Sequence, residues 1–209
     1  MNNINYQKQL LSIIDNIKDK KPKLLLHTCC CPCFLIPFDI LKDHFDITLY
    51  YFNPNIYPYE EYERRKNELL NFLKEEKLND IKVIIPPYED KEFYEIVSKR
   101  KDDKEGHERC RLCFNYRLTH LFQYASDNNF EYVSTVMSIS RYKNAKDLNE
   151  IGYSLEKQFK NVKWLPADFK KNNGYEKELI LCKKYGLYFQ KYCGCKYSFE
   201  AYLSKNSNN

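Results

Sequence analysis

Nine cysteines occur in this chain of 209 residues, and eight of them fall into three short groups. The groups are Cys29, Cys30, Cys31 and Cys33, then the CxxC pair Cys110 and Cys113, and finally the CxC pair Cys193 and Cys195. Thiolates are soft ligands that select zinc, copper(I) or iron–sulfur clusters. Tight CxxC and CxC spacings are typical of metal ligands. The sequence therefore predicts a metal centre assembled from three separated segments.

The number of thiols indicates what kind of centre this is. Cys182 stands alone in a predicted helix and is expected to be a small buried hydrophobe. Cys31 is left open, because if Cys30 faces the site its neighbour can face away. The other seven thiols are too many for one zinc and too few for two all-cysteine zinc sites. They fit a four-ligand cluster plus a second metal with about three thiolates and an open position.

Apolar strands alternate with helices along the chain. Strands are predicted at 23–27, 46–52, 81–85, 132–139 and 162–165, and helices at 7–17, 34–42, 60–76, 92–99, 111–126, 145–159, 175–185 and 199–203. This alternation predicts an α/β fold, with a parallel sheet of about five strands covered by helices on both faces. We expect one catalytic domain over 1–209, with a core from 20 to 204 and a disordered tail from 205 to 209.

The strand exits carry the unusual residues, namely HTCCCPC, NPNIYP, SRYKN and ADFKKNNGY. In parallel α/β folds the site lies beyond the carboxyl ends of the strands. Cys110 and Cys113 begin a predicted helix, and a helix N-terminus is expected to lower the pKa of their thiols.

Composition and charge bear on where the protein works in the cell and on what it binds. No apolar run approaches the length of a membrane span, and the polar N-terminus lacks the apolar region of a secretory signal. We therefore expect a cytoplasmic protein whose thiols stay reduced. The net charge of +5 fits an anionic partner without requiring one.

Five motifs occur in a fixed order: LHTCCCPC, YFNPNIYPYEEYERRK, EGHERCRLCFNYRL, STVMSISRYKN and ADFKKNNGYEKELILCKKYGLYFQKYCGC. In them the chain resembles, over nearly its whole length, the QueH-type epoxyqueuosine reductases, cobalamin-independent enzymes of queuosine synthesis. The resemblance implies a Rossmann-like sheet of the adenine-nucleotide alpha hydrolase (HUP) type. It also implies a [4Fe-4S] cluster beside one additional metal ion, either iron or, in the isolated protein, zinc. The implied reaction is a two-electron reduction of the epoxide of epoxyqueuosine in the tRNA anticodon loop to give queuosine.

The division of the seven thiols between the two metal groups is our own hypothesis. We assign the cluster to Cys30, Cys110, Cys113 and Cys195, and the single metal to Cys29, Cys33 and Cys193. Cys33 stands where relatives often carry an aspartate, so this ligand would stay anionic but become softer. The helix after Gly174 has Glu176 and Lys177 in the region where an Arg-Ser pair is expected.

The implied reaction also needs proton donors and residues that bind the tRNA. The candidates for proton transfer are Asp168, Tyr142, His107 and His27, although Asp168 could equally cap a helix. Unpaired RNA bases are bound by aromatic stacking and cationic contacts. The predicted substrate-binding residues are therefore Asn53, Asn55, Tyr57, Arg64, Arg109, Arg141 and Lys143, whereas Arg65 and Arg111 are expected to be solvated surface charges. The implied partners are a tRNA with a queuosine-type anticodon and an external electron donor, and neither DNA nor a membrane is expected.

Two other functions remain open from the residues alone. An ATP-dependent tRNA-modifying enzyme could use the same fold, but the first strand exit lacks the Ser-Gly-Gly run that would cradle phosphate. A zinc-stabilised RNA-binding module is the non-enzyme alternative. ATP binding tests the first, and analysis for iron and acid-labile sulfide tests the second.

Overall fold

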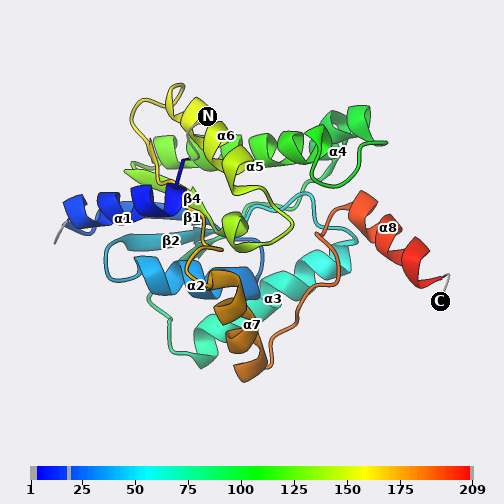
Figure 1. The fold of residues 1–209 in the computed structure, drawn as a ribbon, viewed down its shortest axis with the longest axis horizontal. Helices are drawn as coiled ribbons and strands as arrows, with labels where there is room; N and C mark the ends of the chain where they lie inside the picture. Colours follow the sequence, from blue (N-terminus) through cyan, green and yellow to red (C-terminus); the bar gives the residue numbers. More distant parts are fainter. Residues whose placement is uncertain (1–3, 18–19, 208–209) are drawn as a thin grey trace.

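A five-stranded parallel sheet forms the centre of the computed structural model, which describes residues 4–17 and 20–207 (Figure 1). The strands are β1 (Lys23–His27), β2 (Asp46–Tyr50), β3 (Lys82–Ile84), β4 (Tyr132–Thr135) and β5 (Lys163–Trp164), in the order β3-β2-β1-β4-β5. This confirms the predicted Rossmann-like α/β class, while the HUP type stays a prediction.

Helices cover both faces of the sheet. They are α1 (Tyr6–Ile17), α2 (Cys31–Leu41), α3 (Tyr59–Glu75), α4 (Lys91–Val97), α5 (Glu108–Asp127), α6 (Ala145–Glu156), α7 (Gly174–Lys184) and α8 (Lys196–Asn206). Figure 1 shows α2, α3 and α7 on one side of the strands and α5 and α6 on the other, with α8 at the periphery. Within the part of the chain that is described, no helix combines the length and the apolar character needed to cross a membrane.

The central strand is apolar along its length because it is covered on both faces. Leu24, Leu25 and Leu26 are fully buried, as expected for an inner strand of a parallel sheet. His27 at the end of β1 is level with Tyr50 of β2 and Thr135 of β4. The strand order also reverses between β1 and β4, which makes this edge the switch point where ligands bind in such folds.

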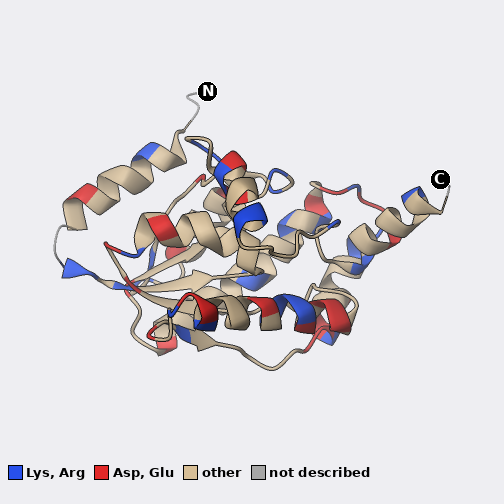
Figure 2. Cartoon of the chain, turned by 90° about the horizontal axis from the view of Figure 1, so that it is seen from below, with Lys and Arg blue, Asp and Glu red and all other residues tan. Residues whose placement is uncertain are grey.

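Charge is spread over the molecule. In the view of Figure 2, Lys and Arg residues are interspersed with Asp and Glu residues along the helices. The positive charges that give the net charge of +5 are therefore not concentrated on a single helix or strand in this view.

Several predicted boundaries need correction. The fourth strand ends at Thr135 instead of residue 139, because the Thr135 hydroxyl accepts a hydrogen bond from the Met137 amide (3.2 Å) and a 3₁₀ turn, Val136–Ile139, follows. Helix α2 begins at Cys31, three residues early, with a proline in its first turn. Helix α8 continues to Asn206, so residues 205 and 206 of the predicted tail are helical, whereas 208 and 209 lie outside the described residues.

Candidate metal centre

Cys29, Cys30 and Cys33 converge at the carboxyl end of β1, and we call them the three-cysteine set. Their three sulfur atoms all lie within 4.8 Å of one another, and the Cys29 and Cys30 sulfurs are 3.8 Å apart. Cys29 and Cys30 belong to the strand exit, and Cys33 lies in the first turn of α2. All three side chains are buried. The chain turn from β1 into α2 is therefore what brings these thiols together.

The pKa values of the three thiols are shifted in opposite directions. Hydrogen bonds from Cys30 and then Cys33 hold the pKa of Cys29 well below its usual value, with help from the positive charge of Lys143. Burial, followed by the interaction with Cys29, raises the pKa of Cys30. Metal binding needs all the thiols deprotonated, so it would release protons from this set.

Cys110, Cys113, Cys193 and Cys195 line a second cavity, and we call them the four-cysteine set. Among the described residues, the three-cysteine set is the one group of three or more potential metal ligands whose ligand atoms lie within 4.8 Å of one another, so these four thiols are not gathered as tightly. Burial raises the pKa of Cys110 to about 11 and that of Cys113 to about 12. The prediction of lowered pKa values at this helix start was therefore wrong, because desolvation outweighs the helix N-terminus.

The two cavities meet at three residues, Tyr142, Lys143 and Cys193, which line both of them. Lys143 is only 8% exposed. Burial alone would lower its pKa, but the charges of Cys193, Cys29 and Cys33 raise it above the usual value. The lysine predicted to bind tRNA thus lies between the two sets of thiols as their shared positive charge.

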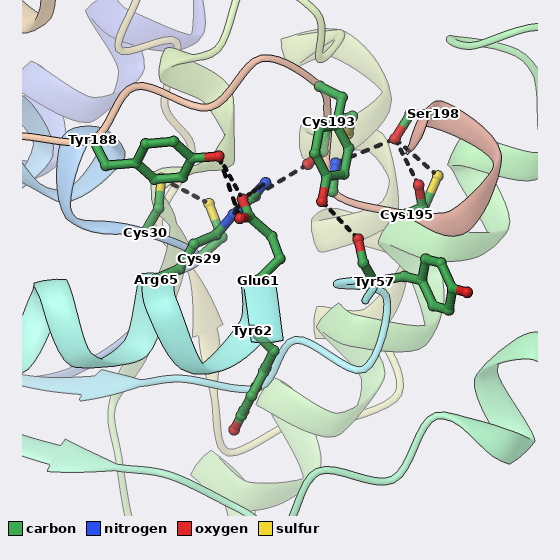
Figure 3. Close-up of polar contacts among 12 residues, drawn as sticks. Cys29, Cys30, Tyr57, Glu61, Tyr62, Arg65, Tyr188, Cys193, Cys195 and Ser198 are labelled. Carbon is green, nitrogen blue, oxygen red and sulfur yellow. Dashed lines mark hydrogen bonds and ion pairs between the residues drawn. The ribbon is translucent and has the colours of Figure 1, made fainter. Parts of the chain in front are cut away.

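Arg65 on α3 holds the loop that carries Cys193 and Cys195 (Figure 3). It is 2% exposed, pairs with Glu61 at 2.7 Å, and its Nη1 donates to the Cys193 carbonyl at 3.4 Å. Tyr188 donates a hydrogen bond to the same Glu61 carboxylate at 3.2 Å. The prediction of a solvated surface charge at Arg65 was wrong, because the loop covers this part of α3.

Tyr57 secures the same loop through its backbone. Its amide donates to the Gly194 carbonyl at 2.7 Å, and its carbonyl accepts from the Tyr192 hydroxyl at 2.7 Å. Tyr57 lines neither cysteine cavity. Tyr57, which was predicted to bind the substrate, therefore holds the loop of Cys193 and Cys195 in place and does not face either cavity.

A buried cation lies beneath the strand ends. Arg117 on α5 donates to the Asn53 side-chain oxygen (2.6 Å), lies 3.1 Å from His27 Nε2, and has its Nη1 4.0 Å from the Cys113 sulfur. Asn53 in turn donates to the Thr28 carbonyl at 2.9 Å. Burial and then the Arg117 charge lower the pKa of His27 to about 3, so His27 stays neutral. Asn53 and His27 are thus held within the protein instead of facing a cavity.

Four other predicted residues lie at or near the cavities. Tyr142 is 56% exposed, and its hydroxyl accepts a hydrogen bond from Arg141 at 2.6 Å. The Arg141 guanidinium lies 4.8 Å from the Tyr142 ring centroid and 5.7 Å from that of Tyr175, at the rim. Asn55 and Arg109 line the four-cysteine cavity, and within the described chain the buried Oδ1 of Asn55 has no hydrogen-bond partner.

The remaining predicted residues lie elsewhere. Asp168 pairs with Lys170 at 3.1 Å, and His107 is an exposed residue preceding α5. Arg64 is exposed and stacks on the Tyr188 ring at 3.4 Å. None of Asp168, His107 and Arg64 lines either cysteine cavity. Arg111, which was expected to be solvated, is partly exposed and forms an ion pair with an aspartate of α6.

Glu178 was missed by the sequence analysis, although it lines the three-cysteine cavity. It shares the buried face of α7 with Gly174 and Cys182, which follow helical i, i+4 spacing. Since Cys182 was expected to be buried, that spacing could have placed Glu178 inside as well. Cys182 is indeed buried, and Cys31 lies in the core and lines neither cavity.

Fold and site together define a Rossmann-like α/β protein with seven cysteines around two adjoining cavities at its switch point. A family model described as epoxyqueuosine reductase QueH matches residues 24–201. A protein of that name from Streptococcus pyogenes serotype M1 is 36% identical over 200 residues, covering 93% of this chain and 78% of the relative. The relative from Staphylococcus epidermidis is 36% identical, covering 93% and 84%, and that from Dehalococcoides mccartyi is 34% identical, covering 89% and 98%. The chain therefore belongs to the QueH family of epoxyqueuosine reductases, which are oxidoreductases.

Proposed function

We propose that this protein reduces the epoxide of epoxyqueuosine in the anticodon loop of a tRNA to give queuosine. Both carbon–oxygen bonds of the epoxide break, a carbon–carbon double bond forms, and the oxygen leaves as water. The reaction consumes two electrons, which an external one-electron donor supplies, and two protons. Family membership supports this function. The structural observation that carries it is the convergence of seven cysteines on two adjoining cavities.

Sulfur spacing supports a division of the two metal groups. On a tetrahedral ion with metal–sulfur bonds of about 2.3 Å, two sulfurs lie about 3.8 Å apart. The 3.8 Å between Cys29 and Cys30 fits one ion held by the three-cysteine set. The more widely spread four-cysteine set fits a [4Fe-4S] cluster, which takes four cysteine ligands. This proposal moves Cys30 to the single metal and Cys193 to the cluster, relative to the division made from sequence.

The residues between the two sets have chemical tasks of their own. When bound, the cluster would supply electrons one at a time and the single metal would polarise an oxygen. Lys143 and Tyr142 line both cavities and carry an N–H and an O–H group there. They are placed to donate a proton or hydrogen bond to a departing oxygen. Asp168 and His107, which lie outside both cavities, are not part of this proposal.

Arg141 is the predicted cation best placed to hold the RNA. It is exposed and stacks near Tyr142 and Tyr175 at the rim of the three-cysteine cavity. Aromatic rings and a guanidinium at one rim suit an unpaired base and its phosphate. Asn55, with its unpartnered buried oxygen, is the group placed to accept a hydrogen bond deeper in the four-cysteine cavity.

The test is metal analysis combined with turnover. Protein made without oxygen should be brown and contain about four sulfides and about five metal ions per chain. With a low-potential one-electron reductant it should convert epoxyqueuosine in tRNA to queuosine. A single zinc without sulfide or turnover would favour the RNA-binding module instead. Stoichiometric ATP binding, with turnover that depends on ATP, would favour the ATP-dependent enzyme.

A further inference from the structure

Glu178 is a buried carboxylate beside thiols. It is 2% exposed and faces the cavity lined by Cys29, Cys30 and Cys33. Over the described chain, no Lys or Arg nitrogen lies within ion-pairing distance of it, and Lys143 acts on it only as a weaker, more distant charge. Buried carboxylates are normally paired with a cation or bound to a metal. Among the described residues, Glu178 is therefore a buried carboxylate without an ion-pair partner.

The packing of two helices fixes where this carboxylate points. Helix α7 packs on α2, whose first turn carries Cys33. The face of α7 toward the interior consists of Gly174, Glu178 and Cys182. Gly174 allows the first turn of α7 to lie against the preceding loop, because a Cβ there would lie 1.8 Å from the Phe169 carbonyl oxygen. Glu178 consequently lines the cavity that also holds Cys33, although without an ion its carboxylate lies outside the group of three thiols whose sulfurs come within 4.8 Å of one another.

The electrostatics of the metal-free arrangement are unfavourable. Glu178 is 2% exposed beside three buried thiols, and a carboxylate buried without a paired cation loses hydration that nothing replaces. A divalent cation among the thiols would reverse this, since it attracts the carboxylate as it attracts the thiolates. Carboxylate oxygens bind such ions at about 2.0–2.2 Å alongside cysteine sulfurs.

We infer that Glu178 supplies an oxygen ligand to the metal ion held by Cys29, Cys30 and Cys33. The inference rests on the single-metal site of the proposed function and adds a ligand to it. It gives the ion a donor set of three sulfurs and one oxygen. An oxygen ligand is harder than a thiolate and is exchanged more easily for another oxygen ligand, such as one from a substrate.

The experiment uses the full chain with its cluster reconstituted anaerobically and the second metal removed by a chelator. Zn²⁺ affinity is measured by competition with a chelator, and Co²⁺ loading is followed by the d–d bands of the difference spectrum. The variant is Glu178→Gln, and the matched control is Glu176→Gln, an exposed residue of the same helix. Glu178→Gln should weaken Zn²⁺ binding at least about tenfold and shift the cobalt bands. Glu176→Gln should match the unmutated protein in both.

The outcomes separate this inference from the function it rests on. If Glu178→Gln keeps the affinity, or loses affinity with an unchanged cobalt spectrum, Glu178 is not a ligand, while the three-cysteine site stands. If the unmutated protein with its cluster takes up no Zn²⁺ or Co²⁺, both the ligand and the single-metal site fall. Should Glu178→Gln fail to fold, Glu178→Asp, which draws the carboxylate back by one methylene, must show the same weakening and band shift.

Discussion

The Arg65 guanidinium occupies the space beside Gly194, where a Cβ atom would lie 2.9 Å from Nη1. Gly194 also has φ +123°, in the region that side-chain-bearing residues rarely adopt. The loop between Cys193 and Cys195 is thus shaped by two conditions at once, a backbone conformation that favours glycine and a neighbour that leaves no room.

Gly194→Ala should lower the free energy of unfolding by about 1–3 kcal/mol, because it adds backbone strain and displaces Arg65. Cluster absorbance should fall in the same variant, since the loop carries two cysteines of the four-cysteine set. The control is Gly186→Ala, at φ +62° with nothing within 4 Å of its Cβ, which should cost about 1 kcal/mol and keep the cluster. Urea denaturation and visible absorbance measure both effects, and equal losses in the two variants would contradict the role of Arg65.

Arg65→Met should destabilise the protein by about 3–5 kcal/mol, because it leaves Glu61 buried without its cation. The double variant Arg65→Met, Glu61→Leu should recover most of that loss, since no uncompensated charge remains. Both should still lose cluster, because neither can hold the Cys193 carbonyl. Denaturant unfolding at matched metal content measures the stabilities. A double variant as unstable as the single one would show that the ion pair is not the cause.

Cys33→Ala should keep the cluster absorbance and sulfide but lose the second metal. Cys33→Asp should retain that metal in part, because an anionic ligand stays at the same position. Cys110→Ala and Cys113→Ala are the contrasting pair and should each bleach the cluster, since they remove ligands of the four-cysteine set. Analysis of iron, zinc and sulfide content, together with visible spectra, measures the metal groups that each of the four variants retains. Loss of the cluster from Cys33→Ala would place Cys33 among the cluster ligands.

Cys182→Ser should keep both metals and most activity. The residue is buried on α7 and lines neither cysteine cavity, so the expected cost is about 1 kcal/mol for a buried hydroxyl. Thermal unfolding and metal analysis check this prediction. Iron loss comparable to that of Cys113→Ala would contradict it.

Affinity for the substrate tRNA should fall as salt rises, because phosphate contacts release counterions. Arg141→Ala should weaken binding and reduce the slope of log affinity against log salt by about 1. Arg64→Ala is the control, an equally exposed arginine that stacks on Tyr188 away from both cavities. Titrations at several salt concentrations measure the slopes. A binding constant independent of salt, or equal slopes for the two variants, would argue against a cationic rim at Arg141.

The sequence predicted those elements of the fold whose structure is decided by burial alone. The bounds of β1 were predicted at 23–27, because a leucine run covered on both faces leaves little ambiguity. The prediction failed after Thr135, where a side-chain hydrogen bond ends an apolar segment that otherwise reads as strand. The start of α2 was also missed, since Cys31 and its following proline carry no periodic apolar signal.

The thiols of the site were predictable, but their grouping was not. Which cysteines meet depends on how three distant segments approach, and local spacing holds no information about that. Arg65 shows the same limit, since its burial comes from contact with a loop 128 residues away. Arg117 lies one helical turn after Cys113 and could have been suspected of facing inward, but its neighbours His27, at the end of β1, and Asn53, after β2, are far from it in the sequence.

The helix that follows the last two cysteines contributes little buried surface. Helix α8 follows Cys195 directly, and Ser198 is the one residue of that helix that is buried. Segments with so little buried surface open locally at low free energy, while inner strands such as β1 open only on global unfolding. Opening of α8 would free the chain that follows Cys195 and leave the sheet intact, together with the contacts of Arg65 and Tyr57 with the loop. Insertion of the proposed metal group would then proceed through the native fold, on the timescale of local opening and not of refolding.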